Sequence, residues 1–499
     1  MADQKAVQAL CEQMKGNKCT AGWDVVCSYA ASQINAFLKA QYDASKLARE
    51  VTLTTTTPDL LTDTTLTITY RLKFASPVIS FVAGRDGYCQ FDMPIMAGST
   101  FQIQPQGGEP QAPVKIPEGH TVRAMVPMAA ASGTTGAVTE LGKVVTFSEG
   151  ADEFQHVILH FKTAKGITFS MVPEPSDKGR LDVILMPLLV SYFQNDVDQL
   201  QYALASINNS TAKEGSKVLT PRSFVLATSG EASDGVLSLF IQVAGSGHPP
   251  GDVNPVFQPG GRAASPVPSG ASASIILSYD LLTGAFLGPQ LASKFATVDW
   301  ISVTSGIQAK LRSDATVVEN GKNENYLFGN CSIDGMSMSL KDFPVTLTIV
   351  DTTVRLQWSG KATSSWYENH LNANGGSYGK VDVTFSVDSG ALPLGSLSNE
   401  DLAIARIKIN SSDFHRQTHA HSCDFLETLN HCSESVPTEY GTLPLSIPDI
   451  SLNLPNLNFF ATTNLLAPGK HVVDIDMSAG IRTPKDFLIL GNVKVAAGR

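Results

Sequence analysis

The sequence contains little charge, no cluster of basic residues and no long apolar run. Charged residues make up 16% of the 499 residues, and the formal net charge is −10. Binding to a nucleic acid needs rows of Lys and Arg that neutralise phosphates, so this composition argues against a nucleic-acid partner. No segment approaches the roughly eighteen consecutive apolar residues that indicate a membrane-spanning helix. The composition is that of a globular chain with a largely neutral polar surface.

The N-terminal segment also lacks the features of a signal peptide. Asp3 and Glu12 lie where such a peptide has its continuous apolar core. We therefore expect synthesis as a soluble cytoplasmic protein, with any release or secretion by a non-classical route.

Cysteine is scarce and scattered. The seven positions are Cys11, Cys19, Cys27, Cys89, Cys331, Cys423 and Cys432. An odd number of widely spaced cysteines in a long chain fits free thiols better than a disulfide framework.

The length of the chain predicts more than one module, because a single hydrophobic core seldom grows to this size. The segment 245–272 is crowded with Gly, Pro and Ser and has no sustained periodicity, which is typical of a linker or long loop. We therefore predict an N-terminal module over 20–244 and a C-terminal module over 273–499.

Alternation of apolar and polar residues is the main secondary-structure signal beyond residue 50. It is clearest at 66–74 and recurs at 345–350, 354–358 and 381–387. This period of two indicates strands with one buried and one exposed face, as in antiparallel sheets.

Three segments share a second pattern, in which an apolar run is followed by Ser-Tyr and then by residues at helical spacing. The Ser-Tyr pairs start at Ser28, Ser191 and Ser278, and each Ser is suited to cap a helix. We predict helices after them, the second reaching residue 207. Such helices could cover the apolar faces of the sheets, so the sequence predicts an α+β fold of amphipathic helices wrapped by antiparallel sheets. Ordinary α+β packing with a filled interior remains an alternative.

Four further segments resemble a known family in sequence and in order. They are 22–35, 219–242, 459–476 and 480–493. Together they resemble the clostridial forty-seven-kilodalton protein family, which is encoded beside botulinum neurotoxin genes of the OrfX type. The resemblance covers nearly the whole chain, from about Gly22 to Val493.

The resemblance implies the tubular lipid-binding (TULIP) fold, an elongated arrangement in which long helices are wrapped by strongly twisted antiparallel sheets around an apolar groove. It also implies a non-enzymatic accessory of a bacterial toxin or toxin-like gene cluster, with phospholipid or another apolar ligand as cargo. A toxin-complex protein partner and peripheral contact with a membrane are part of the same expectation.

The predicted helix faces supply the candidate residues of a lipid-binding groove. They are Ile34, Phe37, Leu38, Phe193, Val197, Leu200, Leu204, Phe286 and Leu287. An acyl chain is held by buried apolar area rather than by a reactive group, and the same residues could equally form a plain core. Two alternative functions follow: a scaffold with a closed core that docks a toxin partner, and a directly membrane-active, insecticidal component that inserts 281–288.

The sequence contains one candidate motif for catalysis and one for metal binding, and neither has the surrounding sequence or the spacing that its chemistry needs. Ser377 lies in a G-x-S-x-G sequence, but a strand pattern follows it where this motif needs a helix. The segment 415–432 holds four His and two Cys, yet their spacing matches no structural zinc pattern. We predict that the protein is not an enzyme and has no cofactor and no metal.

Overall fold

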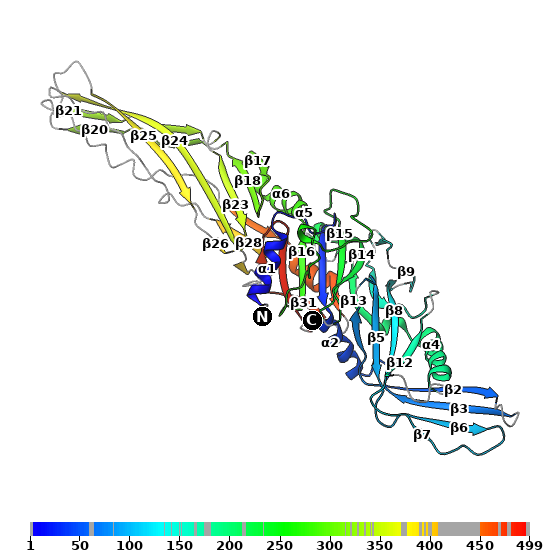
Figure 1. Ribbon diagram of the computed structural model, residues 1–499. Helices are drawn as coiled ribbons and strands as arrows, with labels where there is room; N and C mark the ends of the chain where they lie inside the picture. The colour runs from blue at the N-terminus through cyan, green and yellow to red at the C-terminus, as the bar shows by residue number, and fades with distance from the viewer. Residues whose placement is uncertain are drawn as a thin grey trace. The chain divides into compact units, whose positions relative to one another are not determined.

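The computed structural model describes residues 3–58, 64–173, 181–211, 216–407 and 450–495, with short gaps inside these ranges, and side chains are left out of the description for 315–340 and 358–449. The described chain forms two compact units (Figure 1). Unit 1 comprises Met1–Leu281, Asn456–Gly480 and Asp486–Arg499, and unit 2 comprises Leu282–Pro455 and Ile481–Lys485. These bounds differ from those of the predicted modules, because two C-terminal segments belong to unit 1.

The proposed linker, 245–272, lies within unit 1. Phe257 and Val267 are buried, with 3% and 6% of their surface exposed. Phe257 packs in the same apolar cluster as the first helix, α1 (Gln4–Met14). The segment is therefore attached to the core of unit 1 at two points.

Unit 1 is built on one large antiparallel sheet (Figure 1). Its strands are β1 (Val25–Ala30), β4 (Val78–Phe81), β5 (Tyr88–Pro94), β8 (Thr121–Ser132), β9 (Val138–Glu140), β10 (Val145–Thr146), β11 (Phe154–Leu159), β12 (Phe169–Val172), β13 (Ala203–Asn208), β14 (Pro221–Ser229), β15 (Val236–Val243), β16 (Ala273–Leu277), β30 (Leu465–Ala467), β31 (His471–Ile475) and β33 (Phe487–Val495). They follow the order β10-β14-β15-β1-β16-β33-β31-β30-β13-β11-β8-β5-β4, and β9 and β12 also pair with β8. The sheet curls, since Phe81 at the end of β4 forms a bridge to Ala232 between β14 and β15.

The central strands of this sheet are buried on both faces. Every residue of β15 and β16 is buried, and so are the first five of β1. Helix α1 covers one face, where Leu10 and Met14 share a cluster with Val26 of β1. Residue by residue, Val25 of β1 lies opposite Ile241 on one side and Leu277 on the other. Side chains on both faces are thus removed from water, which is the main source of stability here.

A second sheet in unit 1 confirms the predicted alternation. It has the order β2 (Glu50–Pro58), β3 (Thr65–Lys73), β6 (Thr100–Pro105) and β7 (Val114–Lys115). In β3, Ile68, Tyr70 and Leu72 are buried, whereas Arg71 and Lys73 are exposed.

The helices of unit 1 are shorter than predicted. They are α1, α2 (Ala31–Asp43), the π-helical turn η1 (Leu181–Leu185), α4 (Met186–Asn195), the 3-10 turns η2 (Gln199–Tyr202), η3 (Ser216–Val218) and η4 (Pro259–Gly261), α5 (Tyr279–Leu281), α8 (Leu457–Phe459) and the π-helical turn η9 (Phe460–Asn464). The expectation of long amphipathic helices is therefore wrong, although the mostly antiparallel, β-rich architecture is confirmed. The helix predicted to run to residue 207 ends at Asn195, because Asp198 caps a new turn by accepting from the Leu200 N–H at 3.0 Å.

The Ser-Tyr pairs have three different roles. Ser278 caps a helix as predicted, since its Oγ accepts from the Leu281 N–H at 3.1 Å. Ser28 lies within β1, where its hydroxyl is 2.8 Å from that of Ser238, and Ser191 lies inside α4. The capping prediction is wrong for these two, because the helices begin at other residues.

Unit 2 consists of a short helix and antiparallel sheets. Its helical segments are η5 (Leu282–Leu287) and α6 (Gly288–Ala292), and its strands are β17 (Thr297–Ile301), β18 (Ile307–Arg312), β19 (Thr316–Glu319), β20 (Lys322–Tyr326), β21 (Gly329–Ile333), β22 (Met336–Ser339), β23 (Val345–Val350), β24 (Thr353–His370), β25 (Ser377–Asp388), β26 (Leu392–Pro393), β27 (Ser396–Leu397), β28 (Leu402–Ile407), β29 (Ile450–Leu454) and β32 (Ile481–Arg482). The largest sheet has the order β17-β18-β23-β24-β21-β20, with β25 and β26 also paired to β24. The strands predicted at 345–350, 354–358 and 381–387 are confirmed as parts of β23, β24 and β25.

A buried carboxylate fixes the start of β33 within unit 1. Asp486 is fully buried and accepts hydrogen bonds from the N–H groups of Cys19 and Tyr279, the second at 2.8 Å. Burial raises its pKa from 3.8 to about 6, and the nearby Asp280 adds to the rise, while both N–H groups and Lys18 oppose it.

The free energy of unfolding should therefore contain a part that falls as pH rises. Since the pKa of Asp486 is higher in the folded state, its contribution is complete below about pH 4 and is lost as pH passes about 6. A shift of about two pKa units corresponds to roughly 3 kcal/mol. We expect Asp486→Asn to remove this part, so the difference in unfolding free energy between the two proteins should change by roughly 2–3 kcal/mol between about pH 4 and pH 7 in urea titrations. The exposed Asp86→Asn is the control, and parallel pH profiles for Asp486→Asn and the unsubstituted chain would contradict the prediction.

Candidate functional site

The structure buries most of the residues predicted to line a lipid groove. Eight of the nine have at most 5% of their surface exposed: Ile34, Phe37, Leu38, Phe193, Val197, Leu204, Phe286 and Leu287. The first three lie on α2, Phe193 on α4, and the last two in η5. Their role in ligand binding stays a prediction, since buried residues of this kind also form ordinary cores.

Phe193 lies at the centre of an aromatic cluster in unit 1. Its ring centroid is 4.8 Å from that of Phe161, 5.3 Å from that of Phe169 and 6.0 Å from that of Phe91. Tyr202 also belongs to this cluster, and its ring centroid is 6.1 Å from that of Phe193. These distances are typical of packed aromatic pairs, so this part of the interior is filled by protein rings.

Three other candidate residues of the second predicted helix lie outside any α-helix. Val197 is buried between the end of α4 and the turn η2. Leu200 is in the turn η2 and is 39% exposed. Leu204 lies on β13, whose six residues are all buried between β11 and β30. A strand buried on both faces has no polar side, so its apolar residues also match a helical spacing by chance.

The first half of the η1–α4 segment is apolar on its outer face as well as on its inner one. Leu185, Leu189 and Phe193 form the buried side. On the opposite side Val183 is 69% exposed, Pro187 is exposed, and Leu188 is half-buried. The second half of the outer face is polar, since Ser191 and Asn195 are exposed and Asn195 Nδ2 donates to Ser191 Oγ at 3.2 Å. The sequence contains no charged side chain from residue 183 to residue 195, so Val183, Pro187 and Leu188 form an uncharged apolar patch on the surface.

The remaining sequence predictions concern metals, thiols and membrane spans. Within the described ranges, no group of three or more His, Cys, Asp or Glu could hold a metal ion, and the segment 415–432 lies outside those ranges. Cys27 and Cys89 are free and buried, and burial raises the pKa of each thiol to about 12. Among the described helices, none has the length and hydropathy to cross a membrane.

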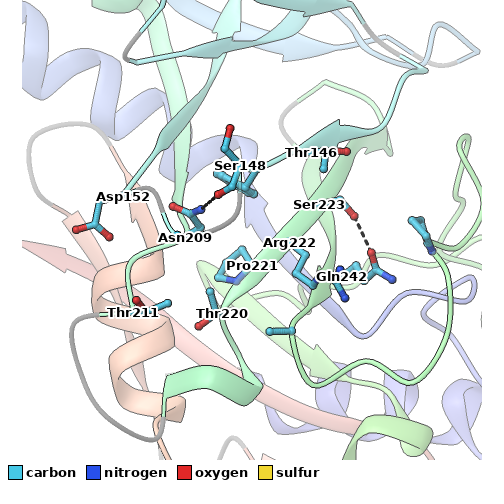
Figure 2. Close-up of a pocket in the computed structure, with 14 residues that line it drawn as sticks. Thr146, Ser148, Asp152, Asn209, Thr211, Thr220, Pro221, Arg222, Ser223 and Gln242 are labelled. Atoms are coloured by element: carbon cyan, nitrogen blue, oxygen red, sulfur yellow. Dashed lines mark hydrogen bonds between the residues drawn. The ribbon is translucent and has the colours of Figure 1, made fainter.

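A cavity of about 510 Å³ with a lining of both polar and apolar groups lies at the β10 end of the unit 1 sheet (Figure 2). Five lining residues carry hydroxyl groups: Thr146, Ser148, Thr211, Thr220 and Ser223. Asn209 and Gln242 add amides, and Asp152 and Arg222 add one carboxylate and one guanidinium. The sequence does not indicate this cavity, because its residues come from four separate segments. Residues 220–223 and Gln242 lie in the segment 219–242, but the resemblance of that segment assigns no ligand contact to them.

Strand pairing places part of the lining in one row. Thr146 lies opposite Ser223, which in turn lies opposite Gln242, so the three side chains share one face of the sheet. The Ser223 hydroxyl donates to Gln242 Oε1 at 3.0 Å. Gln242 Nε2 donates to the carbonyl of His248 at 2.7 Å. This wall is therefore fixed by both backbone and side-chain hydrogen bonds.

Asn209 fixes another wall of the cavity. Its Oδ1 accepts from the Glu153 N–H at 2.7 Å, and its Nδ2 donates to the Ser148 carbonyl at 3.2 Å. Figure 2 shows the hydrogen bonds of Asn209 with Ser148 and of Ser223 with Gln242. The amide thus ties the segment after β10 to the end of β13.

The loop that carries His248 and Pro250 is anchored to a buried carboxylate. Asp24, 1% exposed, lies 3.1 Å from His248 Nε2 and accepts from the Val243 N–H at 3.0 Å. Burial raises the pKa of Asp24, whereas the Val243 N–H and His248 favour its charged form. The loop is held a second time where Trp23 Nε1 donates to the Asp252 carbonyl at 2.9 Å.

The tight approach of this loop to residues 21–23 requires glycine at position 251. A Cβ there would lie 2.4 Å from the Ala21 carbonyl oxygen and 2.6 Å from Trp23 Cδ1. We expect Gly251→Ala to lower the free energy of unfolding by about 1–3 kcal/mol through this overlap. Gly247→Ala in the same loop meets no atom within 4 Å and serves as the control. Equal urea midpoints for the two variants would show that the loop is not held as described.

The aromatic cluster gives a second stability prediction. Phe193→Ala should lower the free energy of unfolding by about 3–5 kcal/mol, because it leaves a cavity between packed rings. Leu200→Ala, at an exposed site, should change it by less than about 0.5 kcal/mol. Both values can be measured by urea unfolding followed by circular dichroism. A small loss at Phe193 would mean that its surroundings are open rather than packed.

Comparison with known proteins gives structural matches only. No protein-family model matches the chain, and no curated protein matches it. P47 from Clostridium botulinum A2 is 12% identical, with a TM-score of 0.47 over 95% of this chain and 98% of that one. P47 of Clostridium botulinum E1 is 15% identical, with a TM-score of 0.47 over 95% and 99%. A lipopolysaccharide binding protein is 10% identical, with a TM-score of 0.28 over 95% and 100%. The first two carry the name of the clostridial family that the sequence resembles.

Proposed function

We propose that this protein is a non-enzymatic binding protein for lipid or another apolar ligand, and that the outer face of η1–α4 makes the contact. The observation that supports this is the uncharged apolar patch of Val183, Pro187 and Leu188 on the outer side of the segment. Its inner side is used to cover the sheet of unit 1, since Leu185, Leu189 and Phe193 are buried. Its outer side leaves Val183 exposed to water at 69%.

Contact with an apolar phase would remove this surface from water. Complete burial of an aliphatic side chain contributes about 1.5–3 kcal/mol, so Val183 together with the half-buried Leu188 could supply a large part of a weak, reversible affinity. The segment 183–195 has no charge, and the whole chain carries a net charge of −10. Because the segment carries no positive charge, this contact does not use attraction to anionic headgroups. Acyl chains are the ligand chemistry that fits an uncharged apolar surface.

The finer parts of the proposal rest on the sequence resemblance. Phospholipid as the ligand, peripheral contact with a membrane and a place among the accessory proteins of a toxin or toxin-like gene cluster are what that family implies. The nine predicted groove residues belong to the same proposal. Leu200 is the one of the nine that is exposed to solvent.

A scaffold function is the second candidate, and one observation favours it. The interior around Phe193 is filled by Phe91, Phe161, Phe169 and Tyr202. A protein with a closed core would use the same apolar face to dock a protein partner. In that case the purified chain would carry no lipid.

Flotation with phosphatidylcholine vesicles tests the proposal. We expect the unsubstituted chain to float with the vesicles and Val183→Asp to bind about tenfold or more weakly, because a charge must then leave water for an apolar phase. Val253→Asp, at a residue 48% exposed in the 246–256 loop, is the matched control and should bind normally. Solvent extraction and mass spectrometry of the same preparations should show bound lipid that is reduced only in Val183→Asp.

Two results would overturn the proposal. One is a lipid-free extract together with no flotation, which would favour the scaffold. The other is equal flotation of both variants, which would place the contact elsewhere. Unfolding midpoints of the variants, measured in parallel, ensure that loss of binding is not loss of folding.

A further inference from the structure

The cavity of unit 1 has the size of a small-molecule site and a lining that mixes hydrogen-bonding groups with apolar surface. Its volume of about 510 Å³ falls within the roughly 300–1,000 Å³ of known ligand pockets. An acyl chain placed there would cover hydroxyl groups such as those of Thr146 and Ser148 without forming hydrogen bonds to them, which weakens its binding. The cavity therefore has a ligand chemistry different from that proposed for η1–α4.

The charges of the cavity argue against a simple ion as its ligand. Arg222 is the one cationic residue among the lining residues that the structure describes, and Asp152 is the one acidic residue. A phosphate attracted by Arg222 would be repelled by Asp152. A cation attracted by Asp152 would be repelled by Arg222. The two charges together match a neutral molecule that both accepts and donates hydrogen bonds.

We propose that this cavity binds a sugar ring, either free or at the end of a glycan. Hydroxyl groups act as donors and acceptors at once, so Thr146, Ser148 and Thr211 match the hydroxyls of a sugar. The carboxylate of Asp152 and the guanidinium of Arg222 are planar groups that can each bridge two neighbouring hydroxyls. Pro221 and Pro250 present C–H surfaces among these polar groups, and the C–H faces of a sugar ring can pack on them.

The walls are already in place before any ligand arrives. Ser223 is fixed by Gln242 and by its pairing with Thr146. Asn209 is fixed by Glu153 and Ser148. Ordering these groups therefore costs little on binding, which favours affinity for a rigid ring.

Titration of the full chain with methyl glycosides of glucose, galactose, mannose and N-acetylglucosamine, followed by saturation-transfer NMR, tests this inference. We expect at least one glycoside to bind and Thr146→Trp to weaken it tenfold or more, because Thr146 is an exposed lining residue whose replacement by Trp would fill the cavity. Thr56→Trp, at an exposed residue of the edge strand β2, is the matched control and should bind as the unsubstituted chain does.

Inorganic phosphate and decanoate are the competing probes. A cavity that binds phosphate but no glycoside, with the loss of binding in Arg222→Gln, would overturn the inference in favour of an anion site. Binding of decanoate that Thr146→Trp abolishes would make the cavity part of the lipid site instead. Absence of any glycoside binding, or equal binding by both Trp variants, would also overturn it. None of these outcomes depends on vesicle binding by η1–α4, so the two proposals are tested separately.

Discussion

The burial of β15, β1, β16 and residues 487–491 of β33 on both faces is the constraint on which unit 1 depends. In β15, β1, β16 and β33 the backbone groups pair with one another, so that apolar side chains can be packed above and below without leaving polar groups unpaired. Val25, Ile241 and Leu277 are each completely buried in this row. Covering both faces requires parts from distant places in the sequence: α1 from the N-terminus and β33 from the C-terminus. The carboxylate of Asp486 joins these parts where they meet.

Elements with one solvent-exposed face can be predicted from the sequence. Elements that are buried on both faces are assigned wrongly. The alternation of Ile68, Tyr70 and Leu72 with charged residues indicates β3 correctly, because water contacts one side of that strand. In β13 every residue is buried, so Leu204 and Ile207 could be assigned to a helix by their spacing alone. The pairing partners of a segment decide whether it forms a strand or a helix, and a local sequence pattern does not reveal these partners.

The two proposed sites differ in what a sequence can reveal about them. The uncharged segment 183–195 is visible in the sequence, although only the structure shows that Val183 points into water. The cavity is not visible, since Thr146, Ser223 and Gln242 become neighbours only through the pairing of β10, β14 and β15. Rigid strands hold the polar groups, whereas a helix presents the apolar ones. The two surfaces share no residue, so substitutions in one should leave the other unchanged.

The curl of the unit 1 sheet also bears on how the protein behaves at high concentration. Unpaired strand edges recruit other chains and start aggregation. Here the sheet ends in β10, with two residues, and in β4, with four. The end of β4 is further occupied by the bridge from Phe81 to Ala232, and Gly235 leaves room for the Phe81 ring at this point. The short strands β10 and β4 and the bridge at Phe81 thus reduce the free edge that this sheet offers to a second copy.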